Sequence, residues 1–299
     1  MKIVRPYTVL DAILTACSVP ETDYTAYSSG TTYAAGALVM VVGTNIHKIY
    51  KSLQEGNVGH DPATSTTWWK DRGATNRWKM FDTLVNSQTV HSANITFTLA
   101  ITGRVNSISF LNVYGSAIRV VATDATDGVV FDHTVNMQSN LGIIEWWSYF
   151  FETPEWNPDC LVTDLPTYTN LSIAVTITAI SGLAKCGACI IGLTKELGDT
   201  QFGASVGIQD YSVKTRDTWG NYTILERAYN KRASFTVWVD NGLVDRLQSL
   251  LASYRAIPIL YIGSDEFGST AVLGFYKDFS INIAYSTYSV CTIEIEGLI

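Results

Sequence analysis

The sequence has little charge of either sign and no strongly basic stretch. Charged residues make up 16% of the 299 positions, and 27 acidic against 20 basic side chains give a net charge of −7. About 25% charged residues is usual for a globular protein. The longest basic run is the pair Lys231-Arg232. Because a nucleic-acid interface needs a basic surface, we expect no nucleic-acid partner. So few charges also favour a surface covered by other protein.

The sequence also lacks an apolar run of about 18–20 residues, the length that a membrane-spanning helix needs. Met1–Arg5 is basic, and Leu14-Thr-Ala-Cys17 resembles a lipoprotein cleavage box. However, Pro6 and Asp11 interrupt the apolar segment that a signal peptide requires. We therefore expect neither secretion nor membrane insertion. Residues 6–16 are interpreted as a short helix or strand that anchors the N-terminus.

Cysteine is scarce and scattered. The five cysteines are odd in number and stand at positions 17, 160, 186, 189 and 291, which favours reduced, buried thiols over a disulfide framework. Cys186-Gly-Ala-Cys189 is a single C-x-x-C, whereas a structural zinc site needs four ligands. Its flanking residues are typical of a strand rather than of the helix that follows a redox motif. We predict that both thiols are reduced and metal-free.

Recognisable catalytic motifs are missing as well. The sequence has no G-x-S-x-G elbow and no phosphate-binding glycine loop, and none of its four histidines stands on a predicted helix beside a carboxylate. Glu145, Glu152 and Glu155 flank an aromatic stretch, and a glycosidase needs two carboxylates about 5–10 Å apart. Because two of these acids border prolines in a predicted loop, solvated acids are the favoured interpretation. We expect no catalytic residue, metal or cofactor, and keep a glycan hydrolase as an alternative.

What the sequence has in quantity is short strand patterns. Residues 95–99 and 171–178 alternate apolar and polar side chains, and Asp127-Gly128 between two such runs is typical of a hairpin. Glu145–Phe151 is predicted to be a dense aromatic strand. Seven or eight short strands separated by turns predict a jelly-roll-like β-sandwich over residues 83–195.

The last third of the sequence differs in pattern. Strands are predicted at 205–213 and 222–226, around the turn Asp217–Gly220. Residues 243–254 then place apolar side chains at helical spacing. The predicted buried face of that helix consists of Leu243, Leu247, Leu250, Leu251 and Tyr254. Residues 196–299 are therefore predicted to be an α+β domain with one helix on an antiparallel sheet, which makes the whole chain mainly β.

A stretch near the N-terminus, residues 24–77, combines aromatic residues and glycines at strand-and-turn spacing. It resembles the type-3 chitin-binding module, a small β fold with three strands that is found in chitinases and in phage virion proteins. Ala37 stands where that family usually has an acidic residue. The positions that match the family pattern are, in order, Tyr27, Tyr33, Gly36, Val39, Tyr50, Asn57, Pro62 and Trp68 or Trp69.

The resemblance implies a lead-in at residues 1–23 and a carbohydrate-binding-like module with its connector at 24–82. Tyr27, Trp68 and Trp69 are the candidate ligand-binding residues, because flat aromatic faces pack against sugar rings. Adjacent strand residues point to opposite faces, so one of the two tryptophans should be core and the other exposed or at an interface. The module is expected either to bind a host surface glycan or to dock a protein.

Motifs across nearly the whole chain are similar to those of tail or carbohydrate-binding virion proteins of tailed bacteriophages. They are Asn76-Arg-Trp78, Trp146–Phe151, Gly203–Ile208, Tyr261–Ser264 and Ile293–Leu298. This resemblance implies a non-enzymatic structural component of the virion, made in the bacterial cytoplasm. It would form a homo-oligomeric ring and dock other phage tail proteins during host attachment. A free carbohydrate-binding protein is a further alternative.

Overall fold

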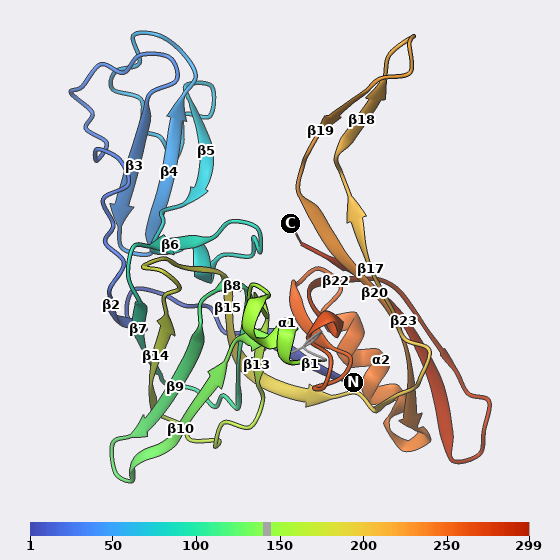
Figure 1. Cartoon of the computed structure of the whole chain (residues 1–299). Coiled ribbons are helices and arrows are strands. Elements are labelled where there is room, and N and C mark those ends of the chain that lie inside the picture. Colours follow the sequence, from blue (N-terminus) through green and yellow to red (C-terminus); the bar gives the residue numbers. More distant parts are fainter. Residues whose placement is uncertain (140–144, 299) are drawn as a thin grey trace.

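The structure is a computed structural model that describes residues 1–139 and 145–298. It is mainly β, and all strand pairings among the described strands are antiparallel. Figure 1 shows a body of two lobes, from which two projections extend on the same side. One projection is the small sheet near the N-terminus, and the other is a long hairpin from the C-terminal third.

One curled sheet of eleven strands runs through the whole body. Its strands, in spatial order, are β13 (Cys160–Val162), β8 (Ser107–Tyr114), β15 (Ala184–Glu196), β1 (Lys2–Pro6), β21 (Ile259–Ile262), β22 (Ala271–Asn282), β23 (Tyr288–Gly297), β20 (Tyr229–Asp240) and β16 (Asp199–Thr200). In addition, β6 (Thr89–His91) pairs with β15, and β17 (Ser205–Asp210) pairs with β20.

The other sheets are smaller. Five strands form the second sheet, in the order β10 (Gly128–Asn136), β9 (Ala117–Asp124), β14 (Leu171–Thr178), β7 (Ile95–Ile101) and β2 (Leu14–Cys17). The third sheet consists of β3 (Leu38–Gly43), β4 (Ile46–Ser52) and β5 (Trp69–Ala74). Two-stranded ribbons pair β11 (Gln138–Ser139) with β12 (Glu155–Trp156) and β18 (Val213–Arg216) with β19 (Tyr222–Leu225).

The five-stranded sheet packs face to face on the first strands of the long sheet, a β-sandwich-like arrangement. Strand β14 shows why, since its residues alternate between buried and more exposed along its length and one face of a strand is thereby apolar. Its buried residues join those of β7, β8, β9 and β15 in one core. The predicted hairpin at Asp127-Gly128 is confirmed: it joins β9 to β10, and Gly128 has a φ of 76°, which a glycine adopts without strain.

The C-terminal lobe packs helix α2 (Val244–Ser253) on the other end of the long sheet. Leu247, Leu251 and Tyr254 are buried against strand residues, and Leu250 is partly buried, so the predicted helix and most of its face are confirmed. Leu243 was placed wrongly on that face. It ends the 3₁₀ turn Asn241–Leu243 and is 47% exposed, because the turn points it away from the sheet-facing side of α2.

Strand β1 joins the two lobes. It lies between β15 and β21, so Ile3 is opposite Lys195 on one side and Tyr261 on the other. The single helix or strand expected over residues 6–16 was wrong: residues 7–13 are a loop and a turn, and the N-terminal segment is held instead by strands β1 and β2, which lie in two different sheets. Because β15 extends to Glu196 and pairs along its length, the long sheet continues without a break across the expected boundary at residue 195.

The predicted aromatic strand at 145–151 was wrong where the structure describes it. Trp146–Phe151 is a short helix, α1, in which the Tyr149 N–H donates to the Glu145 carbonyl at 3.1 Å. A strand would need a partner for its backbone groups, whereas a helix satisfies them within the segment. The expectation came from aromatic density alone, because the segment has no two-residue alternation. The remaining 3₁₀ turns are Lys79–Phe81 and Gly268–Thr270.

Candidate functional site

The three-stranded projection has its own small aromatic core. Tyr27 and Tyr33 stack with ring centroids 5.9 Å apart, and both meet the indole of Trp69 edge-on, at 5.8 and 5.2 Å. Val39 and Tyr50 complete this core. Trp69 is 2% exposed, and its Nε1–H donates to the His60 carbonyl at 2.8 Å. Tyr27 and Trp69, two of the candidate ligand-binding residues, are thus packed against each other.

The third candidate, Trp68, packs against the edge of that core without being buried in it. It occupies the turn just before β5, is half-buried, and stacks flat on the His60 ring with centroids 4.0 Å apart and an interplanar angle of 13°. Trp69 is therefore the core residue of the two, as expected for one of them, whereas Trp68 is half-buried rather than exposed. One face of the Trp68 indole is occupied by His60, so any further ring would have to use the other face or the edge.

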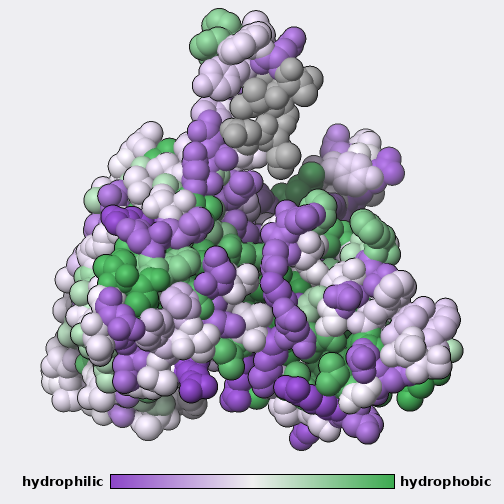
Figure 2. Space-filling model, turned by 90° about the horizontal axis from the view of Figure 1, so that it is seen from below, coloured by the Kyte–Doolittle hydropathy of each residue, from purple (hydrophilic) through white to green (hydrophobic). Residues whose placement is uncertain are grey.

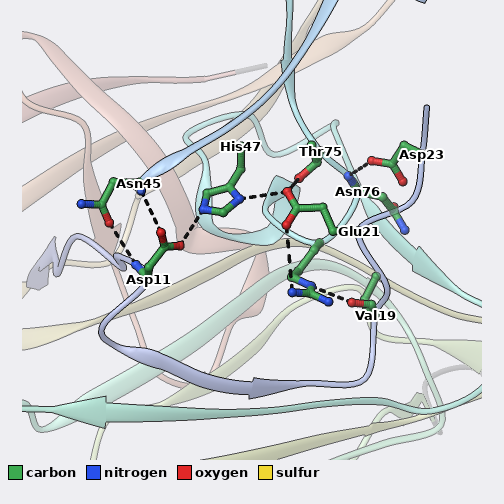
Figure 3. Close-up of polar contacts among 9 residues, drawn as sticks. Asp11, Val19, Glu21, Asp23, Asn45, His47, Thr75 and Asn76 are labelled. Atoms are coloured by element: carbon green, nitrogen blue, oxygen red, sulfur yellow. Dashed lines mark hydrogen bonds and ion pairs between the residues drawn. The ribbon is translucent and has the colours of Figure 1, made fainter. Parts of the chain in front are cut away.

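A polar clasp fixes this projection to the body (Figure 3). His47, on β4, lies between two carboxylates from the lead-in: Nε2 is 2.6 Å from Asp11 Oδ1, and Nδ1 is 2.9 Å from Glu21 Oε1. The Thr75 hydroxyl donates to the same Glu21 oxygen at 2.6 Å. The imidazole also stacks on Trp78 at 4.2 Å. With both ring nitrogens engaged, His47 acts as a fixed bridge.

Backbone contacts extend the clasp on both sides. Asp11 and Asn45 exchange hydrogen bonds, since the Asn45 N–H donates to Asp11 Oδ2 at 2.8 Å and the Asp11 N–H donates to Asn45 Oδ1 at 3.1 Å. The first of these bonds, together with His47, holds the pKa of Asp11 below its usual value. On the other side, the Asn76 N–H donates to Asp23 Oδ2 at 2.6 Å. Sequence reasoning missed the clasp, because its members are far apart in the chain.

The second projection, here called the arm, comprises residues 205–229. Strands β17 and β20 begin it on the body, and β18 and β19 extend it far beyond the body (Figure 1). Its described surface carries large apolar side chains that are exposed: Val206, Ile208, Tyr211, Val213, Trp219, Tyr222, Ile224, Leu225 and Tyr229. The predicted strands at 205–213 and 222–226 match β17 and β19, whereas β18 and the projection of the hairpin into solvent were not predicted.

Helix α1 is a second exposed aromatic feature. Trp146, Trp147, Tyr149, Phe150 and Phe151 are each at least 61% exposed. The acids considered for glycan hydrolysis lie around it, with Glu145 before the helix, Glu152 after it and Glu155 on β12. All three are exposed. Figure 2 shows, from below, that hydrophobic patches also alternate with hydrophilic ridges across both lobes of the body.

The two C-x-x-C thiols lie inside the long sheet. Cys186 and Cys189 are buried on β15, and burial raises the pKa of Cys186 to about 12 and that of Cys189 well above its usual value. All five cysteines are free.

Within residues 1–139 and 145–298, no cluster of three or more histidine, cysteine or acidic side chains is arranged to bind a metal ion. The described helices include none with the length and apolar character to cross a membrane.

Comparison of the sequence with models of known protein families found no match, and comparison with curated proteins found none either.

Proposed function

We propose that this chain is a non-enzymatic structural protein of a phage tail, which assembles into a homo-oligomer through its arm. The observation that carries the proposal is the exposed apolar surface of residues 205–229. A two-stranded hairpin alone is at best marginally stable in water, and contiguous exposed apolar surface marks an interaction site. The resemblance of the sequence to virion proteins supports the same assignment.

In this proposal the parts of the chain have separate roles. The sandwich, jelly-roll-like in its two facing sheets, and the α2 lobe form the rigid body, because one sheet runs through both. The chitin-binding-like module serves as a docking unit for a neighbouring tail protein or a host surface glycan, with the Trp68–His60 pair at its surface. Covering the arm in a symmetric ring would remove both its apolar faces and its free edges from water.

The test is the oligomeric state of the full chain with and without the arm. In the shortened variant, Asn-Gly replaces residues 211–228, since that dipeptide favours the tight turn needed between Asp210 and Tyr229. Light scattering should give a defined oligomer for the full chain and a monomer for the variant, with both bodies melting at similar temperatures. Electron microscopy should show closed rings, and antibodies should label the tail of the particle that carries the protein.

Two outcomes would contradict the proposal. A full chain that is monomeric at its highest soluble concentration, with no partner from the same particle, would remove the assembly role. Turnover of bacterial surface glycan by the purified chain, lost on replacing Glu152 and Glu155 with glutamine, would favour the glycan hydrolase instead.

A further inference from the structure

A cavity of about 600 Å³ lies at the base of the arm, and its lining is more apolar than polar. Phe235 and Gly263 line its inner part, and Val206 on β17 lines the side nearest the arm. Gly263 makes the close packing there feasible, because a Cβ at that position would lie 2.3 Å from the Phe235 ring. The inner part of the cavity is therefore closely packed, because Phe235 and Gly263 leave no room between them.

Two phenylalanines stand at the cavity with no cover. Phe202 is fully exposed, and Phe267 is 60% exposed, although both line the cavity. Covering these side chains would remove apolar surface from water, so this pair favours an apolar, preferably aromatic, occupant.

The cavity also carries acidic groups. Asp199, Asp265 and Glu266 line it, against the cations Lys2 and the N-terminal amine. Lys2 is paired with Asp265, whereas Glu266 makes no ion pair within the described residues. An occupant with a cation beside its apolar group would therefore fit better than an acidic one.

The tip of the arm has those two properties. Trp219 is 86% exposed, and the turn that presents it is ordered by Asp217, whose carboxylate accepts from the Trp219 N–H at 2.9 Å and from the Asn221 N–H at 2.8 Å. The Asn221 side-chain amide also donates to Asp217 at 3.0 Å, and this bond, together with the backbone ones, lowers the pKa of Asp217. Arg216 lies over the Tyr222 ring at 5.6 Å and makes no ion pair in the described part of the chain. The tip thus offers an indole and a free guanidinium.

The arm cannot place its tip in the cavity of its own chain. Trp219 is thirteen positions after Val206, which is about 40 Å of extended strand, and Figure 1 shows β18 and β19 directed away from the body. Only a second copy can bring the two together. Because tip and cavity are different surfaces, such contacts are heterologous and generate a ring or a filament.

We infer that the arm tip of one copy inserts Trp219 into the cavity of the next copy, between Phe202 and Phe267, with Arg216 facing Glu266. This inference rests on the proposed function and names the contact that would build the oligomer.

The first experiment mixes two variants of the full chain, each with one accessible cysteine added in a Cys17→Ser background, since the other four native cysteines are buried. Thr218→Cys labels the tip and Ser269→Cys labels the cavity rim, so both aromatic partners stay intact. Under mild oxidation the mixture should give disulfide-linked dimers, which neither variant gives alone. A mixture of Thr218→Cys with Ser249→Cys, an exposed position on α2, is the matched control.

The second experiment uses light scattering. Trp219→Ala should weaken self-association at least tenfold, whereas Trp146→Ala, at a similarly exposed tryptophan, should not. Arg216→Glu should also weaken it, and adding Glu266→Arg should restore it. Suppose the wild-type chain forms oligomers, the mixture does not cross-link and Trp219→Ala associates normally. Then the oligomer forms without this tip contact, so only this inference fails and the proposed function stands. If the wild-type chain is monomeric, both this inference and the proposed function fail.

Discussion

The Nε2 atom of His47 lies 2.6 Å from Oδ1 of Asp11, and this contact joins the small three-stranded sheet to a segment 36 residues earlier in the chain. The aromatic core of that sheet does not include the His47 ring. The contact therefore orients the projection on the body rather than folding it.

Replacing His47 should loosen the projection without unfolding its core. His47→Ala leaves Glu21, whose side chain is 8% exposed, with one close partner fewer, and a buried group that loses a partner costs about 1–3 kcal/mol. We expect a loss of that size in the free energy of unfolding and faster proteolysis between the projection and the sandwich. The control is His133→Ala on exposed β10, which should change stability by less than about 0.5 kcal/mol. Equal effects of the two variants would contradict the role of the clasp.

Acid should open the same clasp. The pKa of Asp11 is lowered from 3.8 in the folded protein, chiefly by the Asn45 N–H and further by His47. A depressed carboxyl pKa stabilises the fold above the unfolded value, and this contribution disappears as the pH falls through the folded value. The proteolysis rate of the wild-type chain should therefore be constant near pH 5 and rise below pH 3.8, using an acid-active protease. The Asp11→Asn variant should not show that rise, and an unchanged rise would exclude Asp11 as its cause.

Asp82 should destabilise the protein at neutral pH. Burial raises its pKa from 3.8 to about 6, and Oδ2 has no hydrogen-bond partner among the described residues. A raised pKa means stability that is present below pH 3.8 and lost as the pH rises through about 6. Asp82→Asn keeps an acceptor for the Leu84 N–H and should stabilise the fold at pH 8 by about 1–2 kcal/mol, after a discount for partial exposure. Exposed Asp164→Asn is the control, and urea unfolding at pH 4 and pH 8 is the measurement.

The adjacent tryptophans should differ on truncation. Trp69→Ala removes the centre of the aromatic core and should cost about 3–5 kcal/mol. Trp68→Ala removes a half-buried ring stacked on His60, so most of the stability should remain while glycan binding or assembly weakens. Circular dichroism melts, glycan arrays and light scattering distinguish these effects. If both variants lose the same amount of stability, neither tryptophan has a separate binding role, and the projection would act only as a spacer.

Two leucines at the start of α2 form a similar pair. Leu247 is 5% exposed and packs in the C-terminal core, so Leu247→Ala should cost about 2–5 kcal/mol. Leu243, in the preceding turn, is 47% exposed, and Leu243→Ala should change stability by less than about 0.5 kcal/mol. Denaturant titration of both variants checks the helix placement.

Local patterns in the sequence were enough for much of the fold. Alternation predicted β14 at its observed bounds, the Asp127-Gly128 turn predicted the β9–β10 hairpin, and helical spacing predicted α2. These features depend on neighbours within a few residues, which a sequence shows directly. Trp146–Phe151 was misassigned because aromatic content without a period does not separate a strand from a helix.

The amino-acid pattern alone was enough to show that the chain is mainly β, because the alternation of side chains in strands such as β14 follows from backbone geometry. The difference in burial between Trp68 and Trp69 does not come from that alternation, because Trp68 lies in the turn before β5. Only the tertiary structure decided which tryptophan is buried, that β1 lies between two lobes, and that His47 meets Asp11 and Glu21. It also decided that residues 205–229 leave the body. Each of these depends on contacts between residues far apart in the chain, and no local preference specifies such contacts.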